Sequence, residues 1–452
     1  MSNDPSSYSA HGDQETKSLF KLGLESLETV ATNVFGLLIS IPMLAITARS
    51  LGPDGRGAFV TTTTWSSLVA TCCGFSLGLV AIHEMSKAGA AGMRVLLGTL
   101  LSLAVALAII GWVLISVCYR IDHSMFGSVN LHALVLALVA VPLLIAKDYL
   151  GSLLIAKSRV RIWNRAQVAG NVLAVCLVAG LAGVDALTVV GIIIAWLLGQ
   201  MAMCAVAFID LYRCVGAPII DRILACSLLK GGTKLHLNAI GSMLISSVDV
   251  LMVNSFLGTQ EVGYYQLATK LIMNMALIAQ AVAAVMYGRV VELGPDGAWT
   301  LVRRISIITM VVVTGGSLIA AWGAPFIINI IAGKSFAPSV PLFRLMLLAV
   351  PGLSLSFLMS PQWICRGYFW QAGTLTLFVA ICNAVGNWLL VPRYGTVGAA
   401  ASFIGIYVFS IFANGGMFLF CERRWRRSLS TIPGLEASPN QLLMRTSPTQ
   451  GA

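Results

Sequence analysis

Long apolar runs separated by short polar breaks fill most of the chain between residues 29 and 421. A helix needs about 20 apolar residues to cross the hydrocarbon core of a bilayer, so runs of this length predict membrane-spanning helices. The runs do not show the strict alternation that is typical of strands in an outer-membrane barrel. We therefore predict twelve helices, over residues 29–49, 58–83, 94–119, 131–157, 163–182, 186–212, 234–257, 263–290, 301–332, 340–364, 371–392 and 397–421.

Two of the polar breaks carry the same pattern. The stretch RSLGPDGRGAF begins at Arg49, and NSFLGTQEVGYY begins at Asn254. In both, a Leu-Gly pair is followed five residues later by a second glycine and then by an aromatic residue, and the pairs are offset by 258 − 52 = 206. In the first loop Pro53 suits position i+1 of a tight turn, and Gly55 and Gly57 permit a positive φ. We interpret the two stretches as copies of one loop between two helices.

A second similarity has nearly the same offset. The basic turn after the fourth predicted helix, LLIAKSRVRIW, corresponds to QWICRGYFW after the tenth, and Arg366 lies 366 − 157 = 209 residues after Lys157. The widest inner connection, residues 213–233, divides the twelve helices into six and six. Two halves with the same even number of spans and the same orientation are parallel repeats. The sequence thus predicts an all-α integral membrane protein with two six-helix lobes related by an internal repeat.

The distribution of basic residues predicts the orientation of the chain. With twelve spans, 20 Lys and Arg up to residue 427 fall on the side of the two termini and 6 fall on the other side. Cytoplasmic loops collect Lys and Arg, so we expect both termini in the cytoplasm. The predicted parts are a cytoplasmic N-terminal tail at 1–28, an N-terminal lobe at 29–212, a cytoplasmic linker at 213–233, a C-terminal lobe at 234–421 and a cytoplasmic tail at 422–452. The polar N-terminus carries no signal peptide, and we expect it to be disordered.

Composition supports the membrane assignment and excludes several other classes of protein. The chain is 58% hydrophobic and 10% charged, whereas soluble domains carry about 25% charged residues. The net charge of +11 is explained by basic cytoplasmic loops, so we expect no nucleic-acid partner. The ten cysteines lie mostly inside apolar runs and have no spacing typical of a metal site or a disulfide framework. We expect no metal and no cofactor.

At three motifs the sequence resembles the polysaccharide-transport branch of the multidrug/oligosaccharidyl-lipid/polysaccharide (MOP) exporter superfamily. The motifs are ARSLGPDGRGAF after the first predicted helix, SSVDVLMVNSFLGTQEVGYYQLATKL across the seventh and eighth, and LLVPRYGTVGAAASF between the eleventh and twelfth. The resemblance covers residues 20–420 and is most specific in the second motif. It implies a flippase that moves an undecaprenyl-diphosphate-linked oligosaccharide across the bacterial inner membrane for O-antigen, exopolysaccharide or capsule synthesis. The implied partners are this lipid, the bilayer, and a polysaccharide polymerase with a chain-length regulator.

Polar residues inside the predicted spans are the candidate binding residues, because ionisable groups at bilayer depth are costly. Gln266, Lys270 and Asn274 recur every four residues and share one helix face. Asp249 lies about 12 Å from the outer end of its helix, and Lys270 lies about 10.5 Å from the outer end of the next helix. Two hypotheses follow. Asp249 and Lys270 form a structural ion pair between the helices, or they line a cavity in which Lys270 binds a diphosphate.

Three further basic residues are candidates with competing interpretations. Lys147 lies near the middle of its predicted helix, and adjacent Asp148 must face another direction because neighbours on a helix do not face each other. We expect Lys147 to line the cavity. Arg49 and Arg56 flank the outer turn, where they either extend to the lipid headgroups or bind phosphate at the outer mouth through bidentate hydrogen bonds.

Other functions remain as alternatives. A membrane-embedded polymerase or ligase would need a large catalytic segment outside the bilayer, but the outer gaps are short and carry no catalytic constellation. We therefore expect no enzymatic activity and no catalytic residue. A cation-coupled multidrug exporter of the same superfamily would more naturally have an acidic cavity, whereas this chain has at least as many cations as acids at depth. The sequence favours a transporter that alternates access to a cationic central cavity.

Overall fold

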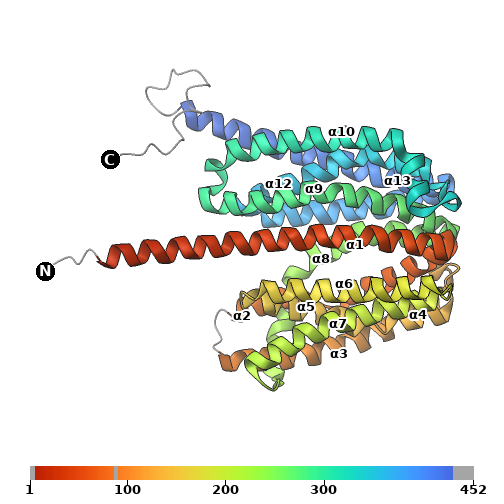
Figure 1. Ribbon diagram of the computed structural model, residues 1–452, viewed down its shortest axis with the longest axis horizontal. Coiled ribbons are helices and arrows are strands. Elements are labelled where there is room, and N and C mark those ends of the chain that lie inside the picture. The colour runs from red at the N-terminus through yellow and green to blue at the C-terminus, as the bar shows by residue number, and fades with distance from the viewer. Residues whose placement is uncertain (1–5, 86–89, 431–452) are drawn as a thin grey trace.

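The computed structural model describes residues 6–85 and 90–430, and these residues form helices and turns without any strand (Figure 1). The first half of the chain contains α1 (Ser6–Cys73), α2 (Leu77–Met85), α3 (Ala90–Ile121), α4 (Leu131–Leu138), α5 (Val141–Ala156), α6 (Val160–Gly183) and α7 (Val189–Val215). The second half contains α8 (Arg222–Leu257), α9 (Thr259–Gly297), α10 (Trp299–Ala332), α11 (Ser339–Met346), α12 (Val350–Cys365) and α13 (Phe369–Ser430). Short 3-10 turns lie at η1 (His123–Phe126), η2 (Lys334–Phe336) and η3 (Leu347–Ala349).

The protein is a multi-pass membrane protein. Nine segments within the described residues are long and apolar enough to cross a bilayer. Helices α1 and α13 each contain a kink where two helices meet, at Gly52 with φ of 66° and at Gly395 with φ of 61°. Glycine adopts a positive φ without the steric cost that other residues have. Each of these two labels therefore covers two helical stretches, and the count of twelve spans stays a prediction.

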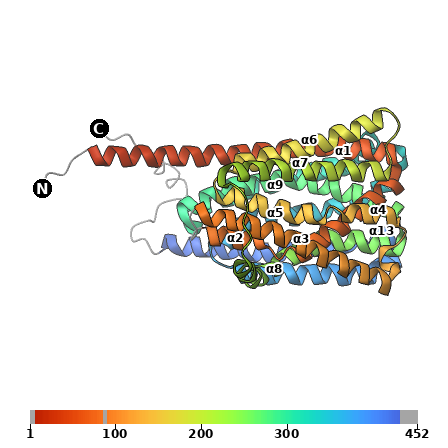
Figure 2. The ribbon, with the colours of Figure 1, turned by 90° about the horizontal axis from the view of Figure 1, so that it is seen from below.

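The first helix begins earlier than the apolar pattern predicts. Helix α1 starts at Ser6, which is 29 − 6 = 23 residues before the predicted start, and its first part projects past the other helices (Figure 1, Figure 2). The expectation of disorder is therefore wrong for residues 6–28. This segment is polar but contains many strong helix formers, so hydropathy alone does not mark it. Residues 1–5 and most of the predicted C-terminal tail lie outside the described residues.

The repeated loop turns at its Leu-Gly pair. Gly52 has a φ of 66° and Gly258 has a φ of 91°, so equivalent residues make the same left-handed turn. The prediction of a positive φ at Gly55 or Gly57 is wrong, because both lie in helical backbone. Pro53 explains the difference. Its fixed φ suits the first position of the following helix, so the residue with positive φ must precede it.

Two broken helices repeat the same local sequence in the two halves. The break between α4 and α5 carries Ala140-Val141-Pro142, and the break between η3 and α12 carries Ala349-Val350-Pro351, an offset of 349 − 140 = 209. The helices that follow these pairs, α6 and α13, begin at Val160 and Phe369, which are again 369 − 160 = 209 residues apart. Element boundaries thus recur with the offset that separates the two basic turns.

Side chains from neighbouring helices bond carbonyl groups that prolines leave free. Proline lacks an N–H, so Pro142 cannot bond the carbonyl of Leu138, and Pro325 cannot bond that of Ala321. The indole Nε1 of Trp112 donates to the Leu138 carbonyl at 2.8 Å. Arg344 Nε donates to the Ala321 carbonyl at 2.9 Å. Inside a bilayer such groups need a protein partner because water is absent.

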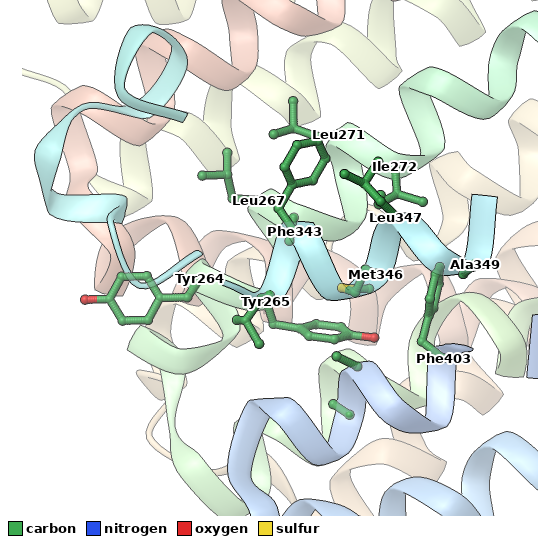
Figure 3. Packing of buried hydrophobic residues seen from close by; sticks show 14 of the residues in the cluster. Tyr264, Tyr265, Leu267, Leu271, Ile272, Phe343, Met346, Leu347, Ala349 and Phe403 are labelled. Atoms are coloured by element: carbon green, nitrogen blue, oxygen red, sulfur yellow. The ribbon is translucent and has the colours of Figure 1, made fainter. Parts of the chain in front are cut away.

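Buried apolar side chains form separate clusters in the two groups of helices seen in Figure 1. One cluster lies mainly among α2, α3, α5 and α7. Another lies mainly among α9, α10, α11, α12 and α13, and it includes Leu44, Ala48 and Val60 of α1. Figure 3 shows part of this second cluster, with residues of α9, α11 and α13 packed together. The part of α1 around the kink therefore packs with the second half of the chain.

The two copies of the repeated loop contact each other. A Cβ atom added to Gly57 would lie 1.7 Å from the carbonyl oxygen of Thr259, and one added to Gly263 would lie 2.0 Å from that of Pro53. The two contacts are equivalent, because 263 − 57 = 206 and 259 − 53 = 206. Such reciprocal pairs are the pattern of a two-fold interface. The backbones of the two halves touch here, and no side chain fits between them.

A methyl group at either glycine should disrupt this contact. We expect Gly57→Ala and Gly263→Ala each to destabilise the protein by about 1–3 kcal/mol or to separate the two loops, because overpacked sites carry costs of this size. Thermal denaturation of the purified protein measures the effect. Gly315→Ala is the matched control, since Gly315 is helical and has no atom within 4 Å of an added Cβ. Equal melting temperatures for Gly57→Ala and Gly315→Ala would contradict the contact.

Candidate functional site

The polar stripe predicted on one helix face lies on α9. Gln266, Lys270 and Asn274 are separated by four residues in an unbroken part of this helix, so their side chains leave the same face. All three side chains are partly buried. The Nδ2 atom of Asn274 is buried and has no hydrogen-bond partner. A buried polar atom without a partner is uncommon in native structures and indicates a group that another molecule can satisfy.

Arg56 joins this stripe from the first half of the chain. It lies on α1 one turn after the kink at Gly52 and is 5% exposed. Its Nη1 donates to Thr47 Oγ1 at 2.8 Å, and its Nη2 donates to Gln266 Oε1 at 2.6 Å. The Nε atom has no partner. A buried side chain cannot reach the lipid headgroups, so the interpretation of Arg56 as a headgroup contact is wrong.

Arg56 and Lys270 form a pair of neighbouring cations. Lys270 is one turn of α9 from Gln266, and its charge interacts unfavourably with that of Arg56. Within residues 6–85 and 90–430, Lys270 has no hydrogen bond or ion pair. The contacts of Arg56 are to a hydroxyl and an amide, which are neutral. The arrangement therefore offers N–H donors and positive charge without a bound carboxylate, which is the chemistry of an anion site.

The structure does not pair Asp249 with Lys270. Asp249 is 2% exposed, and its Oδ2 accepts a hydrogen bond from the Tyr265 hydroxyl at 2.5 Å. Tyr265 and Lys270 are five residues apart on α9, or about 140° around the helix. Asp249 therefore faces Tyr265, which belongs to the apolar cluster shown in Figure 3, while Lys270 lies near Arg56. The hypothesis of a structural ion pair is wrong.

A buried amide cluster near Asp249 was not among the predicted residues. Asn383, Asn387 and Ser402 of α13 are almost inaccessible. The Oδ1 atom of Asn383 accepts from Asn387 Nδ2 at 3.0 Å and from Ser402 Oγ at 3.1 Å. Asn383 Nδ2 donates to the carbonyl of Ile245 on α8 at 3.5 Å. The signal that marks this cluster is a pair of asparagines four residues apart in the apolar run ICNAVGNWLL.

The remaining predicted residues share no hydrogen bond or ion pair with Arg56 or Lys270 among the described residues. Lys147 is partly buried and Asp148 is exposed. Arg49 is exposed and donates through Nη2 to the carbonyl of Ile330, near the end of α10. A cation there bonds a free carbonyl and interacts favourably with the helix dipole.

Arg366, the counterpart of Lys157 in the second half, is held by one acidic residue. Its Nη2 bonds Asp296 at 2.8 Å, and Arg424 bonds the other oxygen of Asp296 at 2.9 Å. The Nε of Arg366 also donates to Gln362. This network ties the end of α12 to the last turn of α9 and to α13, so it is structural. Among the described residues no group of three or more His, Cys, Asp or Glu could hold a metal ion.

The fold is that of known membrane transporters. The chain is similar to a structure of the lipid II flippase MurJ in an inward closed conformation, with a TM-score of 0.71 and 14% identity over 93% of this chain and 95% of that chain. It is similar to an inward-facing MATE family multidrug resistance transporter of the MOP superfamily, with a TM-score of 0.66 and 17% identity over 89% and 99%. A MOP superfamily transporter from Pyrococcus furiosus, described by a reverse polarity of its binding pocket, has a TM-score of 0.60 and 16% identity over 89% and 95%. At these identities the likeness shows the fold alone.

A comparison with curated protein sequences found no match. A sequence profile of the family described as "Polysaccharide biosynthesis protein" matches residues 46–341, which is 296 of the 452 residues. This range contains both copies of the repeated loop, Arg56 and the polar stripe of α9. The match confirms the resemblance that the motifs carry. The chain therefore belongs to the polysaccharide biosynthesis protein family.

Proposed function

We propose that this protein is a flippase that moves an undecaprenyl-diphosphate-linked oligosaccharide across the bacterial inner membrane, with Arg56 and Lys270 binding the diphosphate. The lipid would serve the synthesis of O-antigen, exopolysaccharide or capsule. The family supports a role in polysaccharide synthesis, and the fold supports transport. The protein has no catalytic role in this proposal and needs no cofactor.

The observation that carries the proposal is the cationic pair from the two halves of the chain. A diphosphate has several negative charges, and guanidinium groups bind phosphate through paired hydrogen bonds. Arg56 has a free Nε donor, and Lys270 has no acid partner among the described residues. Because the local dielectric is lower than that of water, each contact with an anion is stronger than it would be at the surface.

Neighbouring polar groups complete the proposed site. Gln266 and Asn274 extend it along α9 on both sides of Lys270, where amide groups can bond sugar hydroxyls or phosphate oxygens. Asp249 contributes indirectly, by fixing Tyr265 and so the orientation of α9. We assign Lys147 of α5 to the cavity wall and Arg49 of α1 to the outer mouth.

The proposed transport cycle uses twelve spans in two lobes, 29–212 and 234–421, joined by the linker 213–233. The tails 1–28 and 422–452 lie in the cytoplasm, which fits the common end at which α1 starts and α13 stops (Figure 1). The repeated helix boundaries and the reciprocal glycine contacts support this internal symmetry. The outer ends of the lobes touch in this structure, so we assign it to a state closed toward the outside. The exported lipid would pass to a polysaccharide polymerase and its chain-length regulator.

Removal of the lysine charge should stop transport. We expect Lys270→Ala to lower the flipping rate by about 10- to 100-fold, because a hydrogen bond to a charged group contributes about 1.5–3 kcal/mol. Lys270→Arg should keep much of the activity. Lys334→Ala, which removes an exposed lysine from η2, is the matched control. Flipping of a fluorescent isoprenoid diphosphate in proteoliposomes measures the rates. Full activity of Lys270→Ala at normal expression would remove Lys270 from the site.

Deletion of the gene distinguishes the flippase from a multidrug exporter. The proposal predicts loss of surface polysaccharide and accumulation of the undecaprenyl-diphosphate oligosaccharide in the cytoplasmic leaflet. Extraction of lipid-linked oligosaccharides from the cells and protection from a membrane-impermeant glycosidase measure both effects. Normal surface polysaccharide together with new sensitivity to cationic drugs would instead assign the chain to multidrug export.

A further inference from the structure

Arg56 takes part in the outer contact between the two halves as well as in the proposed binding site. Its bond to Gln266 joins α1 to α9 across 210 residues of sequence. Two further links lie in the same region, since Thr259 donates to Asp54 Oδ1 and shares a hydrogen bond with Ser128 at 3.1 Å. The glycine contacts lie beside them, at Gly57 and Gly263. The group proposed to bind the substrate therefore also helps to close the outer end.

The closed contact leaves the charge of Arg56 poorly compensated. The guanidinium is 5% exposed, its two acceptors are neutral, and its Nε bonds nothing. Lys270 adds a second positive charge nearby. A buried charge without a charged partner is costly. An amide oxygen satisfies a guanidinium less well than a phosphate oxygen does, because hydrogen bonds between two ionised groups are shorter and stronger.

We propose that Gln266 holds Arg56 only while the site is empty, and that a bound diphosphate takes Arg56 away from Gln266 and so releases the outer contact. This inference rests on the proposed function of the same site. In the empty protein the bond between Arg56 and Gln266 supports closure. Occupation of the site removes that bond, and the population shifts toward the state that is open to the outside. A ligand shifts a conformational equilibrium only through such a difference in its contacts between the two states.

The opposite coupling is also chemically possible and would overturn the inference. A diphosphate that bridges Arg56 and Lys270 without displacing Gln266 would tie α1 to α9 more tightly. The outer end would then close further when the ligand binds. Opening of the outer end when the ligand binds would support the release, and closing would support the opposite coupling. A distance measured across the outer end distinguishes these two outcomes.

Double electron–electron resonance on the full-length protein in nanodiscs measures this distance. Spin labels carried by noncanonical amino acids at Met125 and Ser335, which are exposed near the outer ends of the two halves, avoid the ten native cysteines. Farnesyl diphosphate is the probe, and farnesol is its uncharged control. We expect farnesyl diphosphate to raise the fraction of molecules with a long distance and farnesol to leave it unchanged. A shorter or unchanged distance with bound farnesyl diphosphate would refute the release.

Two substitutions at Gln266 test the same bond, the first without a ligand and the second with farnesyl diphosphate. Gln266→Leu removes the acceptor, and we expect it to raise the ratio of open to closed molecules of the empty protein by about 10- to 100-fold, the effect of one lost hydrogen bond to a charged group. Gln266→Glu gives Arg56 a permanent anion, so its outer end should stay closed when farnesyl diphosphate is added. Gln260→Leu is the matched control, because Gln260 bonds only Tyr264 of its own helix. Equal open fractions for Gln266→Leu and Gln260→Leu would contradict the inference.

Binding measured in the same nanodiscs separates this inference from the proposed function. If farnesyl diphosphate binds the wild type, binds Lys270→Ala at least tenfold more weakly, and leaves the outer distance unchanged, then the site is correct and the release is wrong. If farnesyl diphosphate binds wild type and Lys270→Ala equally, then the proposed site itself is wrong.

Discussion

The buried charge of Arg56 is the constraint on which the rest of the site depends. The arginine lies one turn after the kink at Gly52, in a segment whose backbone touches α9 through Gly57. That close approach brings a charged residue of the first half against the polar face of α9, where the one acceptor from the other half is a neutral amide. A second cation, Lys270, lies on the same face. The protein thus maintains a positive site that its own described residues do not neutralise, and an anion is the ligand that such a site favours.

The residues that recur in both loops and the residues that we propose to bind the substrate are different sets. The glycines that turn and pack the two repeated loops are present in both copies, as are the prolines at the two broken helices. The residues that we propose to bind the substrate are not present in both copies. With the offset of 206, the counterpart of Arg56 is Val262 and the counterpart of Gln266 is Val60. The repeated glycines therefore form the contact, and the polar residues are present in one copy only. Polar residues on one side of the contact would suit the lipid-linked sugar of the proposed function, because the two ends of that ligand differ.

Much of the architecture could be predicted because hydropathy and spacing are local properties. The helical class, most helix positions, the repeated loop and the polar stripe of α9 follow from them. The environment of each charge could not be predicted in this way. An arginine beside a turn has the same sequence pattern whether its side chain reaches the headgroups or is buried. Arg56 is buried because the two repeated loops approach closely at their glycines. The sequence predicts a similar depth for Asp249 and Lys270, but the rotation of α9 directs Tyr265, and not Lys270, toward Asp249.

The most direct test of the binding site is a cryo-electron microscopy structure of the protein in nanodiscs with an undecaprenyl-diphosphate oligosaccharide bound. The account predicts density for the diphosphate in contact with both Arg56 and Lys270, with the isoprenoid chain in the lipid. Diphosphate density at the inner basic turns or elsewhere in the cavity, with Arg56 and Lys270 unoccupied, would contradict it.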